Sequence, residues 1–314
     1  MELCEHAAEL CSIETDWLSQ NDARSYTKDT AITGSFYHYT SAQALMGILS
    51  SRKIWATYAS CFADQAELHA SSPIFRDAAK QIGIDMPIEG NTFHNLRSLR
   101  SYLLKRKSHD PVDSPKGRWL ELRGPFVACF STREDSISHW QLYASQGQGY
   151  RFAVPALDGA RRVIYEESKL REWAVKVLQL AKNVAATRDR LAETQQGDMG
   201  AIWNQVDRLT DRCERLLLEF AACYKNPEYA HEDEWRTVIW GDDLKVEHRG
   251  VSGCIVPYVE IKLPAFQPGV KMPPFIRTGP AFPAEALPAA ETGIRSILNC
   301  PDAVVEKSGH PYLP

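Results

Sequence analysis

The sequence of 314 residues contains no apolar run near the roughly 18 residues that a membrane-spanning helix needs. It also lacks a strong charge of either sign, because 36 Lys and Arg oppose 40 Asp and Glu for a net charge of −4. A global field that attracts nucleic acid is thereby excluded, whereas a local basic patch is not. The first six residues are acidic and mixed, unlike a signal peptide. We expect no membrane segment and a cytoplasmic protein.

Several motifs that carry common chemistries are missing as well. No Cys-x2-Cys, HExxH or His-x3-His spacing is found, so we expect no metal. A P-loop and a GxSxG elbow are also absent, and Gly147-Gln148-Gly149 lacks the third glycine of the dinucleotide-binding fingerprint. The eight cysteines show no paired spacing, which is typical of mostly buried thiols in a reducing compartment.

The residues that are present predict a large folded domain over residues 1–314. Apolar residues make up 44% of the chain and include 8 Trp and 12 Tyr, enough for a sizeable core. Helical periodicity covers 2–20, much of 64–107 with a break at 83–90, and 290–298, and Ser41 is a candidate N-cap for a helix through Leu49. Residues 264–290 are rich in proline and are expected to be irregular. Strand-like segments lie at 35–40, 53–56, 125–131, 150–154, 162–165, 235–240, 256–263 and 303–306. Strands in both halves, separated by helices, predict an α+β fold with a mixed central sheet and an N-terminal helical region.

Residues 166–224 form the clearest element that periodicity alone predicts. The segment has no proline, and its glycines are confined to 197–200. We expect two helices, 166–194 and 201–224, folded back at 195–200 as a hairpin inserted into the domain. An inserted hairpin, a lid and a homodimer contact fit this pattern equally well.

One concentrated basic segment runs from Arg97 to Lys107. It is either a solvated helix face or a contact for a polyanion such as nucleic acid.

Three segments place polar or titratable groups at the ends of predicted strands, where a rigid sheet can hold a reactive site. They are 38–40, 131–132 and 231–236. Glu232 and Glu234 have i, i+2 spacing, which on a strand puts both carboxylates on one face. Each would raise the pKa of the other unless a cation intervenes, and Arg236 continues the same face. The alternatives are a solvated strand edge for the carboxylates and a core position for His38.

Ordered blocks between residues 36 and 312 resemble the bacterial DUF2971 family. The matching blocks are 36–41, 44–49, 54–56, 129–131, 135–143, 147–149, 232–236, 276–280, 305–308 and 311–312. The helical segments 1–20, 64–107 and 166–224 carry little of this resemblance.

A second resemblance, to the ADP-ribosyltransferase-like fold, implies a sheet that surrounds NAD with residues from three strands. By this resemblance His38 contacts a ribose of NAD, with Tyr39 and Thr40 beside it, and Ser131 or Thr132 supports the nicotinamide ribose. Glu234 takes the place of the catalytic carboxylate, and Glu232 aligns or deprotonates the acceptor. Tyr39 or Tyr143 supplies a face on which nicotinamide stacks.

The resemblances imply a transferase that moves ADP-ribose from NAD to a nucleic acid or a protein, in bacterial defence or as a toxin. Two other functions stay open. One is RNA-end processing or RNA binding on the same fold, in which the segment 97–107 grips the RNA backbone. The other is a sensor or scaffold without catalysis, which acts through the hairpin and uses the polar residues to fix the sheet.

Overall fold

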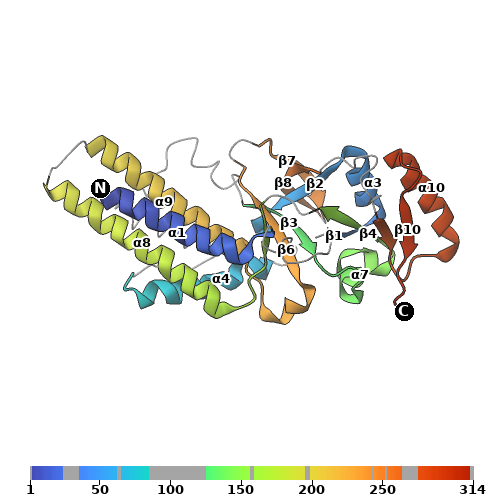
Figure 1. Ribbon diagram of the computed structural model, residues 1–314, viewed down its shortest axis with the longest axis horizontal. Coiled ribbons are helices and arrows are strands. Elements are labelled where there is room, and N and C mark those ends of the chain that lie inside the picture. Colours follow the sequence, from blue (N-terminus) through green and yellow to red (C-terminus); the bar gives the residue numbers. More distant parts are fainter. Residues whose placement is uncertain are drawn as a thin grey trace.

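The computed structural model describes residues 2–23, 35–61, 65–84, 125–155, 159–194, 199–241, 244–251, 253–263 and 275–311. The basic segment 97–107 therefore lies outside the described residues, as do most of the predicted break at 83–90 and of the predicted turn at 195–200. The fold is mixed α+β with a mixed, open sheet. Several helices gather at one end of an elongated molecule, and the sheet with the other labelled helices forms the other end (Figure 1).

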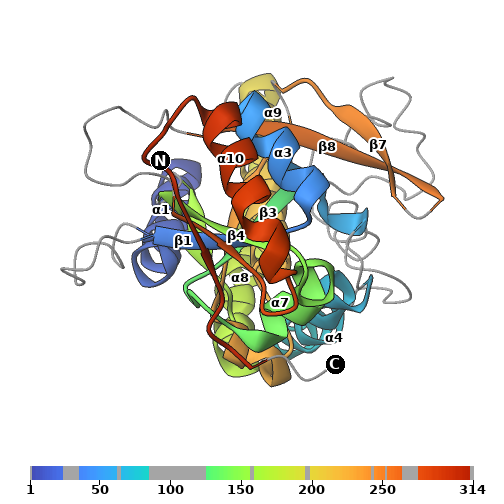
Figure 2. The same ribbon diagram turned by 90° about the vertical axis from the view of Figure 1, so that its right-hand side faces the viewer.

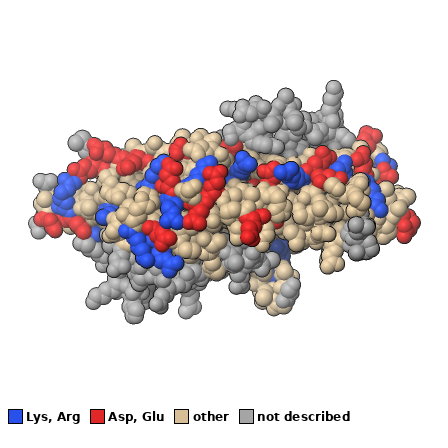
Figure 3. Space-filling view, turned by 90° about the horizontal axis from the view of Figure 1, so that it is seen from below, with Lys and Arg blue, Asp and Glu red and all other residues tan. Residues whose placement is uncertain are grey.

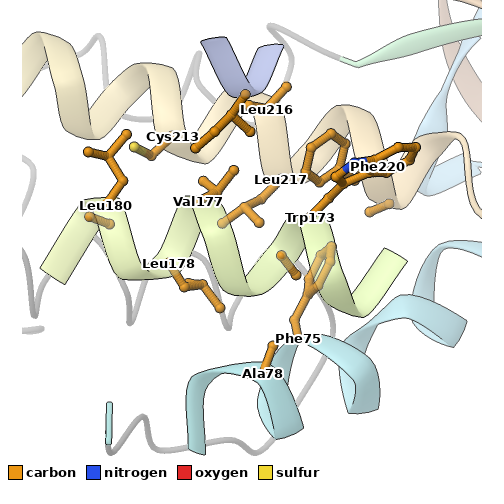
Figure 4. Close-up of a cluster of buried hydrophobic side chains, with 14 of the residues drawn as sticks. Phe75, Ala78, Trp173, Val177, Leu178, Leu180, Cys213, Leu216, Leu217 and Phe220 are labelled. Carbon is orange, nitrogen blue, oxygen red and sulfur yellow. The ribbon is translucent and has the colours of Figure 1, made fainter. Parts of the chain in front are cut away.

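The helical end is a bundle whose members come from three parts of the chain. Its helices are α1 (Glu2–Asn21), α4 (Gln65–Gln81), α8 (Glu167–Thr194) and α9 (Met199–Ala222). In α8 the buried residues recur at helical spacing, as at Leu170, Trp173 and Val177. Trp173 packs against Phe220 of α9 with ring centroids 5.7 Å apart, inside the core that Figure 4 shows.

The two predicted helices of the hairpin are thus confirmed, and α1 and α4 cover them within the same chain. The homodimer through residues 166–224 stays a prediction.

Ten strands form the sheet, in the order β10-β9-β4-β1-β3-β2-β8-β7, with β6 bonded to β3 and β5 bonded to β6. Only β9 and β10 run parallel among the paired strands that the structure describes. The strands are β1 (Ser35–Thr40), β2 (Lys53–Tyr58), β3 (Phe126–Ser131), β4 (Tyr150–Pro155), β5 (Ala160–Arg162), β6 (Glu234–Ile239), β7 (Glu247–Val251), β8 (Cys254–Lys262), β9 (Phe275–Thr278) and β10 (Val304–Lys307). The sequence did not predict β7 and β9, and β5 lies earlier than the strand predicted at 162–165. The prediction that 264–290 is irregular is wrong at β9 and at residues 287–290, which are helical, and residues 264–274 lie outside the described residues.

The two faces of the sheet have different coverings. Helices α3 (Ala42–Ser51) and α10 (Leu287–Leu298) lie side by side over one face, here the α3 face (Figure 2). The N-cap predicted at Ser41 is confirmed, since its hydroxyl accepts a hydrogen bond from the amide of Ala44 at 3.2 Å. The opposite face, here the α7 face, is covered by the bundle at Val127 and Val238 and by α7 (Ile137–Tyr143) at Tyr39. The candidate site lies between these two coverings.

Strand β3 is the branch point of the sheet. All six of its residues pair with β6 along one edge. The other edge is divided, because Phe126 and Val127 pair with β2 whereas Ser131 pairs with Tyr37 of β1. His38 lies at this division, where its Nδ1 is 3.0 Å from the carbonyl oxygen of Cys129.

Close backbone contacts hold α7 against the ends of β1 and β9. A Cβ atom on Gly149 would lie 2.4 Å from the carbonyl oxygen of Thr40, and one on Gly279 would lie 2.1 Å from that of Gly147. The amide of Gly279 donates to the carbonyl of Gly149 at 2.9 Å. Only glycine permits this approach, and it fixes the side chains that α7 presents to the sheet.

On the face drawn in Figure 3, acidic and basic side chains intermix, so the described residues there form no large region of a single charge. No helix of the described part of the chain is both long and apolar enough to cross a membrane. All eight cysteines are free. Two are buried and three are exposed, so the prediction that most of them are buried is wrong.

Candidate active site

Two carboxylates meet one ammonium group where the short helix η3 (Pro227–Glu232) leads into β6. Lys225 Nζ lies 2.7 Å from Oε2 of Glu232 and 3.1 Å from Oε2 of Glu234. The predicted closeness of the two carboxylates is confirmed, but strand spacing is not its cause, because β6 begins only at Glu234. Asp233 between them is left-handed, with φ 49° and ψ 49°, a conformation that Asp tolerates better than most residues. This turn directs both carboxylates toward Lys225.

Arg236 completes a cluster of four buried charges, which we name the four-charge cluster: Lys225, Glu232, Glu234 and Arg236. The guanidinium of Arg236 donates to Oε1 of Glu234 from Nε at 2.8 Å and to Oε2 from Nη2 at 3.0 Å. Its Nη1 donates to the carbonyl oxygen of Ala222 at 2.8 Å. None of the four residues is more than 6% exposed. Two positive and two negative charges balance, as buried charges require.

Cations do intervene between the two carboxylates, and they determine the ionisation of Glu234. Burial alone would raise the pKa of this carboxyl. The charge and hydrogen bonds of Arg236 and the charge of Lys225 outweigh burial and lower the pKa to about 2. Glu234 is accordingly ionised at neutral pH.

Neighbouring groups fix the backbone on both sides of the carboxylates. Ser131 is paired with Glu234 across β3 and β6, and its hydroxyl donates to the carbonyl oxygen of Glu232 at 2.7 Å. The same hydroxyl accepts from the amide of Arg133 at 3.0 Å. The phenol oxygen of Tyr165 accepts from the amide of Glu234 at 3.0 Å, and burial raises the pKa of Tyr165 to about 12. Ser131 thus positions η3 relative to β3.

Helix α7 closes the cluster from the solvent side with aromatic groups. The hydroxyl of Tyr143 lies 3.2 Å from both carboxylate oxygens of Glu232, while the residue is 46% exposed. His139, one turn earlier on the helix, has ring centroids 5.7 Å from Tyr143 and 4.9 Å from Tyr39. Burial is the main reason that the pKa of His139 falls to about 4, so its imidazole is neutral at pH 7. Burial also raises the pKa of the Tyr143 phenol, which keeps it a hydrogen-bond donor.

The structure does not bring His38 to this site. Tyr37, Ser131 and Glu234 are register partners across β1, β3 and β6, so their side chains share the α7 face. His38 follows Tyr37 in β1 and points to the α3 face, where its ring packs against Phe130 and Phe152 at 5.8 and 5.6 Å. The expectation that its imidazole converges with the Glu234 carboxylate is wrong, because side chains alternate along a strand.

The other predicted positions divide between the two faces. Thr40 lies two residues after His38 and therefore points to the α3 face as well. Tyr39 lies on the α7 face, where its hydroxyl donates to the carbonyl oxygen of Arg133 at 2.8 Å. Thr132 follows the end of β3, and its amide donates to the carbonyl oxygen of Asp233 at 3.2 Å. The site thus contains Ser131, Glu232, Glu234 and Tyr143, with Tyr39 and Thr132 at its border.

Two groups of the site escaped the sequence analysis. Lys225 follows a long helix, and nothing in its neighbourhood of the sequence distinguishes it from an exposed lysine. His139 could have been found, because it lies four residues before Tyr143 and this spacing puts both side chains on one side of a helix. Within the described ranges no group of His, Cys, Asp and Glu side chains is arranged to hold a metal ion.

Comparisons of the chain with models of protein families, with curated proteins and with solved structures find no match. The resemblances to the DUF2971 family and to the ADP-ribosyltransferase-like fold stay predictions.

Proposed function

We propose that the protein is an enzyme of the ADP-ribosyltransferase-like type that transfers ADP-ribose from NAD to a macromolecule. One observation carries the proposal, the presence of two carboxylates beside an exposed aromatic ring. The buried, ionised Glu234 is paired with Ser131 across β3 and β6, and the neighbouring Glu232 contacts the hydroxyl of the half-exposed Tyr143. Such an arrangement suits a reaction in which positive charge develops on a sugar, as in the cleavage of glycosidic bonds.

The residues of the α7 face fit NAD in part. Tyr143 offers a flat aromatic ring beside the carboxylates, which is what a nicotinamide ring needs for stacking. His38 does not supply the implied ribose contact from this face, where the imidazole of His139 lies beside Tyr143. When bound, NAD supplies the ADP-ribosyl group and nicotinamide as the leaving group. In the proposal Tyr143 and His139 hold the nicotinamide end.

Glu232 and Glu234 differ in their hydrogen bonds, and we therefore assign them different roles in the reaction. Both oxygens of Glu234 are engaged by cations, since Arg236 binds Oε1 and Oε2 and Lys225 also binds Oε2. In Glu232, Lys225 binds Oε2, and the hydroxyl of Tyr143 contacts both Oε1 and Oε2. Displacing this neutral phenol costs less than displacing a bidentate guanidinium. Glu232 therefore presents its carboxylate to the sugar in the proposal, and Glu234 is a positioning residue that holds Lys225 and Arg236.

The rim of the site favours an anionic acceptor such as RNA. Arg133 and Arg162 are more than half exposed, and both lie near the single carboxylate of Asp233, at 3.4 and 3.5 Å. Exposed ion pairs of this kind are weak, so both guanidinium groups can turn to phosphates. A setting in bacterial defence or toxicity rests on the resemblance alone.

Variants of the two carboxylates test the proposal. The purified protein is incubated with NAD that is radiolabelled in its adenine and with mixed RNA, DNA and protein, and free nicotinamide and transferred label are measured. Glu232→Gln should lower the rate by about 100-fold or more, as expected when an electrostatic stabiliser of a transition state is removed. Glu234→Gln should also lower the rate, but with a loss of unfolding free energy of about 3–5 kcal/mol, because Arg236 and Lys225 lose their shared partner.

The exposed Glu260, which pairs with Lys53 on the sheet, supplies the matched control. Glu260→Gln should leave both rate and stability unchanged. The proposal fails if the wild-type protein neither binds NAD in a titration nor releases nicotinamide, or if Glu232→Gln keeps the wild-type rate. In that event the four-charge cluster has a structural role and only stabilises the sheet.

A further inference from the structure

A buried arginine lies on the same face of the sheet as the four-charge cluster, two strands from Ser131. Arg151 of β4 is paired with Tyr39 of β1 and with Arg277 of β9. Register partners share a face, so both arginines lie on the α7 face. The side chain of Arg151 is fully buried. Its guanidinium carbon lies 4.5 Å from the ring centroid of Tyr37 and 5.0 Å from that of Phe275.

The hydrogen bonds of Arg151 are incomplete. Its Nη2 donates to Oε1 of Glu134 at 3.0 Å, whereas Nε and Nη1 are buried and find no hydrogen-bond partner in the described part of the chain. Arg236, equally buried on the same face, is paired at all three nitrogens. Buried polar groups are nearly always hydrogen-bonded, and an exception calls for a missing water or ion. The unpaired N–H groups of Arg151 therefore mark a place for an acceptor.

The charges around Arg151 favour an anion as that acceptor. Burial and the neighbouring charge of Arg277 both lower the pKa of Arg151, so its cation is incompletely compensated. Arg277 approaches Asp135 at 3.0 Å, Glu306 at 3.3 Å and Glu134 at 3.5 Å. Asp135 is held by the indole of Trp140 and the hydroxyl of Ser308. Glu134 is 49% exposed and is shared by the two arginines, so it is the carboxylate that an incoming anion can displace.

We propose that Arg151 and Arg277 form a subsite for a phosphate or diphosphate group, which Glu134 occupies in its absence. The inference rests on the proposed function in one respect, the identification of this anion as the diphosphate of NAD. The guanidinium of Arg151 lies over the ring of Tyr37 in β1, and β3 separates β1 from β6. The guanidinium is therefore about two strand spacings, or about 10 Å, from β6. An extended ligand spans this separation with its sugar at Glu232 and its anionic group at Arg151. A planar guanidinium suits phosphate oxygens.

Titration calorimetry with inorganic diphosphate tests the subsite without any reaction. Arg151→Gln should weaken diphosphate binding by about tenfold or more, as the loss of a charge-assisted pair predicts. Arg249→Gln is the matched control, because Arg249 also lies over two aromatic rings of the sheet, those of Trp55 and Tyr258. This control should bind diphosphate as the wild type does. Equal affinities of wild type and Arg151→Gln, or no binding by the wild type, would overturn the subsite.

A second variant keeps the test informative if Arg151→Gln does not fold. Glu134→Ala changes a half-exposed side chain and removes the competing carboxylate, so diphosphate should bind several-fold more tightly. Unchanged or weaker binding would contradict the displacement of Glu134. If diphosphate binds through Arg151 but Glu232→Gln releases nicotinamide from NAD at the wild-type rate, the subsite stands and the proposed function fails.

Discussion

At the scale of single residues, His38 has a structural explanation that differs from the role implied by the resemblance. Its ring packs between Phe130 and Phe152, and its Nδ1 contacts the carbonyl oxygen of Cys129, which pairs with Arg236 of β6. Since a carbonyl only accepts, Nδ1 carries the proton. Burial lowers the pKa of His38, so this neutral form persists at pH 7. The imidazole supplies a hydrogen bond where the sheet divides.

His38→Phe should therefore cost stability and spare activity. Phenylalanine fills the apolar space but removes the hydrogen bond from Nδ1 to the Cys129 carbonyl oxygen, which should lower the free energy of unfolding by about 1–3 kcal/mol. Urea denaturation measures this loss, and the release of nicotinamide from NAD measures activity. His248→Phe, at an exposed position of β7, should change stability by less than about 0.5 kcal/mol. Loss of activity in a fully stable His38→Phe protein would instead return His38 to the site.

At the scale of elements, the placement of α7 depends on glycines that no side chain can replace. Gly149→Ala would put a Cβ atom 2.4 Å from the carbonyl oxygen of Thr40, so the end of β1 and the segment after α7 must separate. We expect a loss of unfolding free energy of about 1–3 kcal/mol and a weaker hold on Tyr143 and His139. Melting temperature reports the first effect, and NAD affinity reports the second.

Gly47→Ala provides the control for this substitution. Gly47 lies within α3 and has nothing within 4 Å of an added Cβ atom, so alanine there should raise stability by up to about 1 kcal/mol through its helix propensity. A Gly149→Ala protein as stable as wild type would show that the contacts of Gly149 do not fix α7.

The sequence predicts most of the helices and strands, but not which residues share a face of the sheet. Periodicity found α8, α9 and most strands because each buries a regular face, and the carboxylate pair stood out as charges beside a buried strand. Which residues share a face depends on where a strand begins and on its register. Glu232 is outside β6, and His38 has the opposite parity to Tyr37 and Ser131. Register is fixed by pairing with distant strands, which is why the sequence alone did not separate His38 from the site.

At the scale of the whole molecule, the four-charge cluster joins the helical bundle to the sheet. Arg236 of β6 bonds the last residue of α9, Ala222, and Lys225 follows three residues later. The backbone of residues 223–225 also pairs with Ile164, which precedes α8. The inserted hairpin thus enters and leaves the sheet beside the site. Loosening of the bundle would displace Lys225, so the stability of the bundle and the geometry of the carboxylates are coupled.

Acid should destabilise the protein in two stages that these buried groups define. The pKa of His139 falls from its ordinary 6.5 to about 4 in the folded state, so between these pH values the unfolded chain binds more protons. Stability therefore declines as pH falls through this window, by about 3 kcal/mol. The pKa of Glu234 falls from 4.5 to about 2, which adds a decline of similar order as pH drops from about 4.5 to 2.

Urea denaturation between pH 7 and 2 separates the two contributions. His139→Gln should flatten the decline between pH 6.5 and 4, because glutamine does not titrate, and should leave the decline below pH 4 in place. Glu234→Gln should start from a lower stability and flatten the decline below pH 4.5. It should also steepen the decline above pH 4, because the charge of Glu234 raises the pKa of His139. His248→Gln serves as the control, since His248 is exposed on β7, a strand paired with β8 at the far side of the sheet order, and its loss should leave both stages unchanged. The contrary outcome is a His139→Gln protein whose unfolding free energy changes with pH above pH 4 as steeply as that of the wild type. The imidazole would then be solvated in the folded state, and α7 would lie farther from the sheet than its contacts with Tyr39 and Glu232 require.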